Sequence, residues 1–521
     1  MKDYKKILLY VVLALVSLIL LHNWTKYQQQ YQAKQQVNTK NKNHKSNTDT
    51  ENNLQVDNKI QKVNNLIPQK RLIHIKTDVL NLYVDKLNGN IIKAGFEKYK
   101  DSLNSNNDFQ LIDYQKPVNY IAYSKLIGFT NKKILYVSAK NNYELLKTNN
   151  NLVVVLHAKT NNGLQISKTL TFNRDSYLIK IQYNISNNSN NTLIGQYVLG
   201  ISHANYVPKK DKVTKFHNFY GFAISTPDKN YQTYKLKKIT DTTINVTNTK
   251  SWIAMIQHYF ITAWIPNPNI SYKYHSKVNN DNNNAIYNII ASSPQINIKP
   301  NETINNTDKI YIGPTVTSRL KKAAPYLNMT VDYGWLWPIS IAIFWLMQKI
   351  YSLIGNWGWA IIITTCIIKL VFWQLSAKSY KSMAAMSSLQ PKIKALKERF
   401  GADNKQALSK EMMMLYKKEK INPMGGCLPI LIQIPFFIAL YWVLIASVEL
   451  RHAPFLLWIK DLSAHDPYYI LPIIMGSTIF LQQKLSPSPI DPSQAKMMMF
   501  MPIFITAILM KLPSGLILYL S

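Results

Sequence analysis

Cysteine is scarce in this chain: among 521 residues only Cys366 and Cys427 are cysteines, and the large middle region has none. A disulfide framework is therefore excluded in that region. The histidines show no metal-ligand spacing, and the sequence has neither a phosphate-binding glycine loop nor a nucleophile elbow. We therefore predict that the chain is not an enzyme and that it holds no cofactor and no metal.

Acidic residues are also few. The chain has 27 Asp and Glu against 61 Lys and Arg, which gives a formal net charge of +34. Such an excess permits contact with nucleic acid, the ribosome or anionic lipid headgroups. Because the apolar residues collect at the two ends of the chain, the sequence favours anionic phospholipids and the ribosome as partners. We do not expect recognition of a specific nucleic acid sequence.

The N-terminus has the pattern of a membrane anchor. Lys2, Lys5 and Lys6 precede the apolar run 7–21, which is typical of a secretory signal or a signal-anchor. No small-x-small cleavage site follows, and Trp24 suits the membrane interface. We predict an uncleaved transmembrane signal-anchor over residues 1–24. Residues 25–67 are dominated by Gln, Asn, Lys and Ser, a composition that predicts a disordered linker.

Residues 68–325 change to a period of two. Leu164, Ile166, Leu170 and Phe172 alternate with polar neighbours, a polar turn follows at 173–176, and the alternation resumes up to Ile185. This pattern predicts a β-hairpin with one buried face. Similar short runs at 80–84, 152–156 and 286–290 extend the prediction to an all-β sandwich domain.

The C-terminal third predicts a multi-pass membrane protein with an α-helical core of five to six spans. Residues 377–420 carry eleven basic residues against four acids, so we place this segment in the cytoplasm. We predict an interfacial amphipathic helix on the outer surface at 335–353, transmembrane helix 2 at 355–376 and a cytoplasmic helical hairpin at 377–425. Transmembrane helices 3–5 and the start of helix 6 are predicted at 427–521. Since the last apolar stretch stops at Ser521, we expect either a truncated chain or an incomplete final helix.

Lys369 interrupts the otherwise uncharged run 357–375. A charge near the middle of a membrane helix costs about 3 kcal/mol on insertion scales, so such residues usually face protein or water. The alternative is that its long stem reaches to the nearer interface. Gln433 is predicted at a similar depth, and Thr365 one helical turn deeper than Lys369 on the same face. Together these three side chains indicate a hydrated groove that is open to the cytoplasm and closed towards the outside.

Each of the other polar groups has a simpler interpretation. Thr365 alone could bond to its own helix backbone, and Gln433 alone could join two helices. In the hairpin, the methionines Met383, Met386, Met412 and Met413 either contact substrate or pack the two arms together.

Several long motifs resemble one family, the YidC membrane protein insertases of the Gram-negative type with a large periplasmic domain. The motifs, in chain order, are Asp332-Tyr333-Gly334-Trp335, Asn422-Pro423-Met424-Gly425-Gly426-Cys427, Gln433-Ile434-Pro435, Ser447-Val448-Glu449-Leu450-Arg451 and Pro513-Ser514-Gly515. The resemblance implies a bacterial inner-membrane location and a periplasmic β-supersandwich. It also implies that Lys369 replaces an arginine at the centre of a substrate groove, with Thr365 and Tyr519 at matching groove positions.

The function implied by the resemblance is insertion and folding of nascent transmembrane segments in the inner membrane. The implied partners are nascent membrane proteins, the Sec translocon and the ribosome or signal-recognition pathway. Two alternatives stay open at this point: an ion- or solute-coupled transporter, and a membrane-anchored carbohydrate-binding domain.

Overall fold

A computed structural model describes residues 67–103, 105–130, 132–206, 219–281, 284–400, 405–419, 428–485 and 492–521. The predicted signal-anchor and nearly all of the predicted linker lie outside these ranges, as do the turn of the cytoplasmic hairpin and the motif at 422–427.

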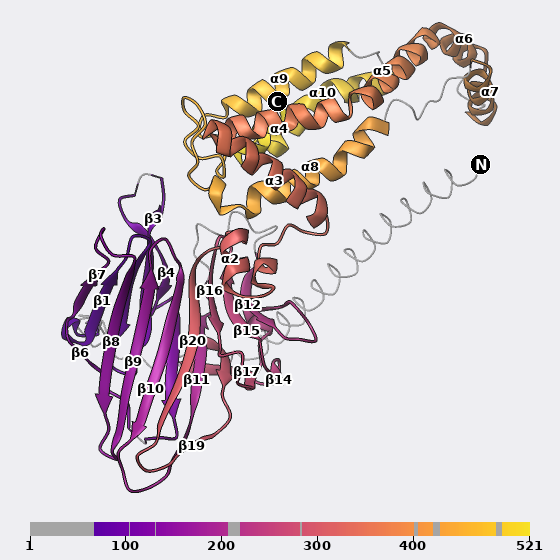
Figure 1. Ribbon diagram of the computed structural model, residues 1–521. Helices are drawn as coiled ribbons and strands as arrows, with labels where there is room; N and C mark the ends of the chain where they lie inside the picture. Colours follow the sequence, from indigo (N-terminus) through magenta and orange to yellow (C-terminus); the bar gives the residue numbers. More distant parts are fainter. Residues whose placement is uncertain are drawn as a thin grey trace, which may run out of the picture. The chain divides into compact units, whose positions relative to one another are not determined.

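Two antiparallel sheets form the N-terminal part of the described chain (Figure 1). One sheet has eleven strands, in the order β14-β17-β18-β11-β5-β3-β2-β1-β7, with β19 beside β11 and β4 beside β3. Its strands are β1 Leu72–Lys76, β2 Leu80–Asp85, β3 Asn90–Lys100, β4 Asp108–Asp113, β5 Ile121–Ile127, β7 Asn142–Glu144, β11 Leu193–Ala204, β14 Asn245–Asn248, β17 Tyr272–Asp281, β18 Asn284–Ser292 and β19 Ile296–Ile298. Within the described residues, β1 and β7 are the one parallel pair.

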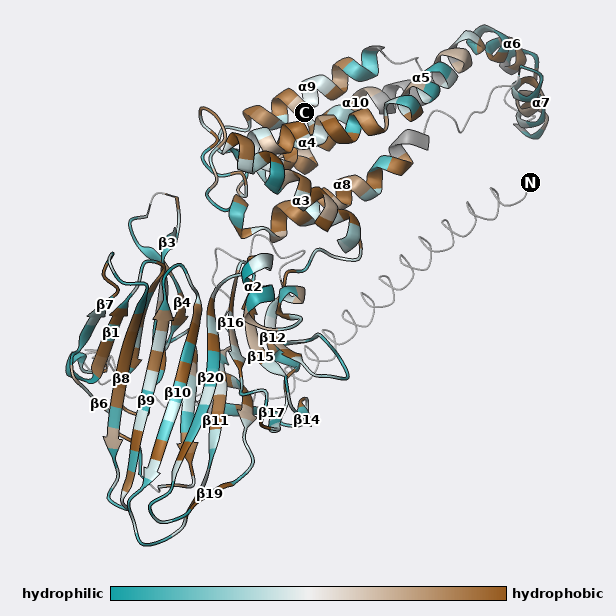
Figure 2. Ribbon diagram, in the orientation of Figure 1, coloured by the Kyte–Doolittle hydropathy of each residue, from teal (hydrophilic) through white to brown (hydrophobic). Residues whose placement is uncertain are grey.

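The second sheet has nine strands, in the order β13-β12-β15-β16-β20-β10-β9-β8-β6. Its strands are β6 Val137–Ser138, β8 Asn151–Lys159, β9 Leu164–Asn173, β10 Leu178–Asn187, β12 Tyr220–Ser225, β13 Gln232–Lys235, β15 Trp252–Gln257, β16 Phe260–Ile265 and β20 Thr303–Pro314. The predicted hairpin is confirmed as β9 and β10, in which Phe172 is paired with Ile179 and Ile166 with Ile185. Its alternation appears as the striped strands of Figure 2.

Two charged residues lie inside the sandwich. Lys168 is buried, and its Nζ donates to the Gly89 carbonyl at 2.6 Å and to Ser124 Oγ at 2.8 Å. Asp308 is also buried and accepts from the Tyr272 hydroxyl. Burial disfavours both charges, so it lowers the pKa of Lys168 to about 7 and raises the pKa of Asp308 to about 7.

The C-terminal part is helical. Its longer elements are α3 Trp337–Ile354, α4 Trp357–Val371, α5 Trp373–Ser388, α6 Gln390–Phe400, α7 Lys405–Lys418, α8 Leu428–Ala446, α9 Ile470–Leu485, α10 Pro492–Leu509 and α11 Ser514–Leu520. Between the last strand and α3 lie the short helix α2 Thr317–Ala323 and the 3-10 helix η4 Leu327–Thr330, and the 3-10 helix η6 Val448–Leu450 follows α8. Two further 3-10 helices, η1 Gln69–Arg71 and η3 Leu236–Lys238, lie among the strands of the N-terminal part. Hydrophobic residues dominate α3 and α8, whereas hydrophilic ones gather in α6 and α7 (Figure 2).

Length and composition single out one described helix that could cross a membrane alone, namely α3. This is the segment that the sequence analysis predicts to lie at the interface. Helices α4 and α5 would make a second span if the bent pair is one span, and Leu431–Ala446 and Met499–Leu509 are shorter apolar helices. The predicted number of five to six spans therefore stays a prediction.

The second predicted span is not one continuous helix. Helix α4 ends at Val371, and α5 continues after a bend of 60°. Phe372 lies at the break with φ −91° and ψ 5°, and its N–H bonds to the carbonyls of Ile368 and Leu370. Its ring packs edge-on against Phe436 of α8, with the centroids 4.9 Å apart. Lys369 therefore lies in the last turn of α4, not in the middle of a helix.

The first arm of the predicted hairpin is also broken, at Leu389 between α5 and α6. Pro391 lies in the first turn of α6, where its missing N–H costs no hydrogen bond, whereas in an unbroken helix it would remove a backbone hydrogen bond and clash with the preceding turn. At this break the Leu389 side chain lies in the hairpin core, where it is buried with Ile393 and Tyr416.

Candidate functional site

Four helices meet at one end of the helical region, at the loop 447–469 between α8 and α9. Asn356 caps α4 by accepting from the N–H groups of Gly358 and Trp359, and its amide donates to the Phe455 carbonyl of this loop. At α11, the N–H of Ser514 donates to the Ala464 carbonyl at 2.7 Å. We call this end of the helices the loop end. Asn356 was not among the predicted residues, although an Asn directly before an apolar run is a recognisable cap signal.

Helix α11 packs closely on α4 because Gly515 has no side chain. A Cβ at Gly515 would lie 3.2 Å from Ile361 Cδ1. Both helices run away from the loop end, so Tyr519 and Thr365, each four residues further on, lie at about the same level, ~6 Å beyond this contact. The structure thus brings these two predicted groove residues to neighbouring helices at one depth.

Thr365 is buried, and its hydroxyl donates to the Ile361 carbonyl of its own helix at 2.8 Å. This is the simpler of the two interpretations given for it above. The neighbouring Thr364 was missed: its hydroxyl is buried and has no hydrogen-bond partner within the part of the chain that the structure describes. Sequence alone does not separate the two threonines, because both suit an apolar helix.

Lys369 is exposed, and no described residue forms a hydrogen bond or an ion pair with it. It follows Thr365 by one helical turn, so it lies at the margin of the face that packs against the other helices. Its neighbours Leu370 and Val371 are also strongly exposed, at 70% and 72%. Thirteen residues separate Lys369 from the Asn356 cap, which places it ~20 Å along the axis from the loop end.

Gln433 is half-buried on α8, which runs towards the loop end. Two ring contacts give two limits for the position of Gln433 along the helix axis. The Phe437 ring lies 6.1 Å from that of Tyr519, which places Gln433 at about the level of Lys369. The contact of Phe372 with Phe436 instead places Gln433 ~9 Å further from the loop end than Lys369.

The hairpin methionines divide into two groups. Met386 and Met412 pack against the buried core of Leu389, Ile393 and Tyr416. Met413 is 58% exposed. Met383 lies in α5, but its side chain is outside the described part of the structure. The two packed methionines thus have the role of joining the arms.

Other polar side chains of this region are structural. Asp466 is fully buried and accepts from the N–H groups of Tyr468 and Leu471, just before α9. Ser340 of α3 donates to the Ala439 carbonyl of α8 at 3.2 Å. Across the described residues, no group of three or more His, Cys, Asp or Glu side chains could hold a metal ion.

Two family models match the chain in succession. Residues 72–346 match the model described as "YidC periplasmic domain", and residues 349–521 match "60Kd inner membrane protein". The chain belongs to the YidC family of membrane protein insertases. It is accordingly an inner-membrane protein with a periplasmic domain, the β-sandwich described above. Because insertion makes and breaks no covalent bond, this membership agrees with the prediction that the chain is not an enzyme.

Two relatives support this assignment over nearly the full length of the chain. The "Membrane protein insertase YidC" of Legionella pneumophila strain Paris is 43% identical, over 99% of this chain and 94% of the relative. The protein of the same description from Coxiella burnetii strain Dugway 5J108-111 is 40% identical over the same shares. A solved structure, "Active YidC insertase crystal structure with the first transmembrane domain resolved", is 17% identical over 87% of this chain and 90% of that chain, with a TM-score of 0.39.

Proposed function

We propose that this YidC family member receives the polar, translocated part of a nascent transmembrane segment beside Lys369, on the cytoplasmic side of the helical region. The observation that carries the proposal is an exposed lysine without a partner in the described residues, at the margin of a packed helix face. The loop end faces the periplasm in this proposal, since the periplasmic domain contacts it: His258 donates to the Ile445 carbonyl at 3.1 Å. Lys369, ~20 Å from that end, then belongs to the cytoplasmic half of a hydrocarbon layer of about 30 Å.

The proposed step needs only solvation and charge. An acidic end of a substrate loses water when it enters the membrane, and the ammonium of Lys369 with its hydration replaces part of that solvation. The apolar part of the substrate then moves into lipid, which is favourable by about 25 cal/mol for each Å² removed from water. Lysine offers a point charge and not the planar fork of arginine, so it attracts a carboxylate without bidentate capture. Thr365, Tyr519 and Gln433 would line the same site.

Reconstitution tests this proposal. Purified protein in liposomes is given a short two-span substrate with an acidic or a neutral translocated segment, and insertion is scored by protease protection. We expect Lys369→Ala to slow insertion of the acidic substrate by roughly fivefold, as a lost attraction of about 1 kcal/mol would, and to leave the neutral one nearly unchanged. Lys369→Arg should insert both substrates like the parent.

The matched control is Lys484→Ala, which removes another exposed lysine from the last turn of a neighbouring helix, α9. It should insert both substrates at the parental rate. Equal insertion of the acidic substrate by the parent and by Lys369→Ala would contradict the proposal. The transporter alternative predicts instead a solute flux that Lys369→Ala abolishes without an insertion defect, and the same liposomes measure it.

The finer assignments belong to this proposal. We propose five to six spans, with α3 lying at the periplasmic interface, and a sandwich of the supersandwich type. As partners we propose the Sec translocon, the ribosome or signal-recognition pathway, and anionic phospholipids, which the lysines of α6 and α7 would attract. Of the hairpin methionines, the exposed Met413 is the described candidate for substrate contact.

A further inference from the structure

The motif at residues 447–451 has no part in the insertion step described above. After α8 ends, this motif forms the short helix η6. Its residues Val448 and Leu450 are both buried, with 1% of their surface exposed. Arg451 follows directly, and its N–H bonds to the Val448 carbonyl. The buried residues anchor this loop in the helical region, so the Arg451 side chain starts from a fixed position.

The Arg451 side chain reaches the periplasmic domain. Its Nη2 donates to the carbonyls of Lys100 at 2.7 Å and Asp101 at 3.1 Å. The guanidinium carbon also lies 5.3 Å from the ring centre of Phe109 and 5.8 Å from that of Phe260, within the range of a cation–π contact. One arginine of the helical region thus makes both polar and aromatic contacts with the sandwich.

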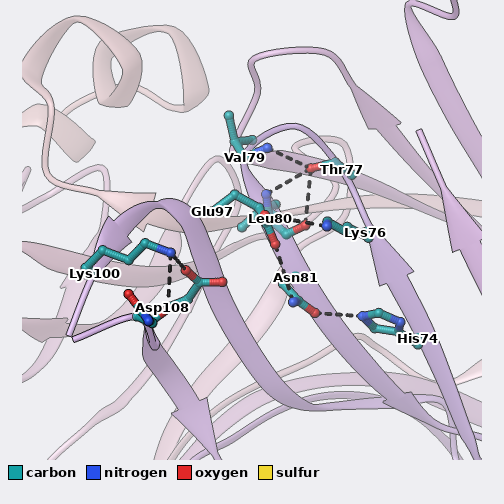
Figure 3. A network of polar contacts seen from close by, with 10 residues as sticks. His74, Lys76, Thr77, Val79, Leu80, Asn81, Glu97, Lys100 and Asp108 are labelled. Atoms are coloured by element: carbon teal, nitrogen blue, oxygen red, sulfur yellow. Dashed lines mark hydrogen bonds and ion pairs between the residues drawn. The ribbon is translucent and has the colours of Figure 1, made fainter. Parts of the chain in front are cut away.

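The surface that receives Arg451 has contacts of its own within the periplasmic domain. Lys100 ends β3 and Asp108 begins β4, and their side chains form an ion pair of 2.6 Å next to the two acceptor carbonyls in the chain (Figure 3). Behind it, Phe109 and Phe260 are stacked with their centroids 4.4 Å apart. The residues around the acceptor carbonyls and the aromatic faces are therefore also held by contacts that do not involve Arg451.

We infer that Arg451 is a positioning residue that holds the periplasmic domain in one orientation on the membrane region. Interfaces between domains of one chain are often small, and relative motion is the default where nothing fixes them. Arginine suits this task because its planar group donates several hydrogen bonds while it stacks on aromatic rings. The hydrogen bond from His258 to Ile445, on the same loop end, supplies a second fixed point.

Distances between spin labels test this inference without measuring insertion. In full-length protein with Cys366→Ser and Cys427→Ser, Asn297→Cys labels the exposed face of β19 and Lys460→Cys labels the exposed loop of the helical region. We expect a narrow distance distribution in this background. With Arg451→Ala added, the width should grow at least about twofold, because the domain gains freedom. Arg451→Lys, which keeps a cation and one donor, should lie between the two.

The matched control is Arg319→Ala. Arg319 lies on α2, donates to Asp175 within the periplasmic domain and stacks on Tyr177 at 5.3 Å, so its loss removes the same kind of group without touching the loop end. It should leave the distribution narrow. An unchanged width in Arg451→Ala, or equal broadening in Arg319→Ala, would overturn the inference. If Arg451→Ala does not fold, Asp108→Asn, which loosens the acceptor loop from the other side, must broaden the distribution for the inference to stand.

Discussion

Lys168 of the β-sandwich is buried and donates to Gly89 and Ser124, whereas Lys369 of the helical region is exposed and has no partner in the described residues. Around Lys168 the apolar side chains point inwards, because that domain folds in water. Beside Lys369, the apolar side chains of Leu370 and Val371 are instead strongly exposed. The comparison teaches that the hydrogen bonds of a buried lysine can serve structure even where burial disfavours its charge. We propose that an exposed lysine without a partner in the described residues is instead available to a substrate.

The largest expected effect is on the free energy of unfolding, when the buried Lys168 is replaced. Lys168→Ala removes the donor to the Gly89 carbonyl and one of the two donors to Ser124 Oγ, which keeps the Tyr183 hydroxyl, and it opens a cavity. We therefore expect the free energy of unfolding to fall by about 3–5 kcal/mol. Urea unfolding of the full-length protein followed by circular dichroism measures it. Lys180→Ala, at an exposed position of the adjacent strand β10, should change it by less than about 0.5 kcal/mol. A mild effect of Lys168→Ala would show that its hydrogen bonds are dispensable.

Glu449 gives an intermediate case, in the loop between α8 and α9. Burial raises its pKa from 4.5 to about 7. Folding therefore favours the protonated form, so this contribution to stability is complete below pH 4.5 and is lost as the pH rises through about 7. We expect Glu449→Gln to raise the melting temperature relative to the parent at pH 8 and much less at pH 5. The same difference at both pH values would show that this carboxyl does not titrate on folding.

A smaller effect on stability is expected in the cytoplasmic hairpin, where a packed and an exposed methionine can be compared. Met412 packs in the hairpin core and Met413 is exposed, although the two are adjacent in sequence. We expect Met412→Ala to reduce the stability of the hairpin by about 1–2 kcal/mol and Met413→Ala by less than about 0.5 kcal/mol. Amide hydrogen exchange of α6 and α7 reports this difference. Equal loss of protection in both variants would mean that both side chains pack between the arms.

Local patterns could be predicted from the sequence, and long-range contacts could not. The alternation that ends at Phe172 and resumes at Ile179 specifies the β9–β10 hairpin, since one register alone buries both runs. Lys168 and Gly89 are 79 residues apart in the sequence, and no comparable pattern predicts their contact. The bend at Phe372 could not be predicted either, because no Pro or Gly lies next to it in the sequence.

The candidate site shows the same limit. Spacing alone placed Thr365 and Lys369 on one helix face, but it could not tell that the Thr365 hydroxyl bonds to its own backbone. Nor could it place Tyr519 beside α4, because that depends on the close approach that Gly515 allows.

The accessibility of position 369 tests the central claim most directly. In the background of Cys366→Ser and Cys427→Ser, Lys369→Cys is exposed to a membrane-impermeant maleimide from either side of oriented vesicles. We expect rapid labelling from the cytoplasmic side and none from the periplasmic side. Failure to label from either side, as a residue facing lipid would show, or labelling from both sides, as in a continuous pore, would contradict it.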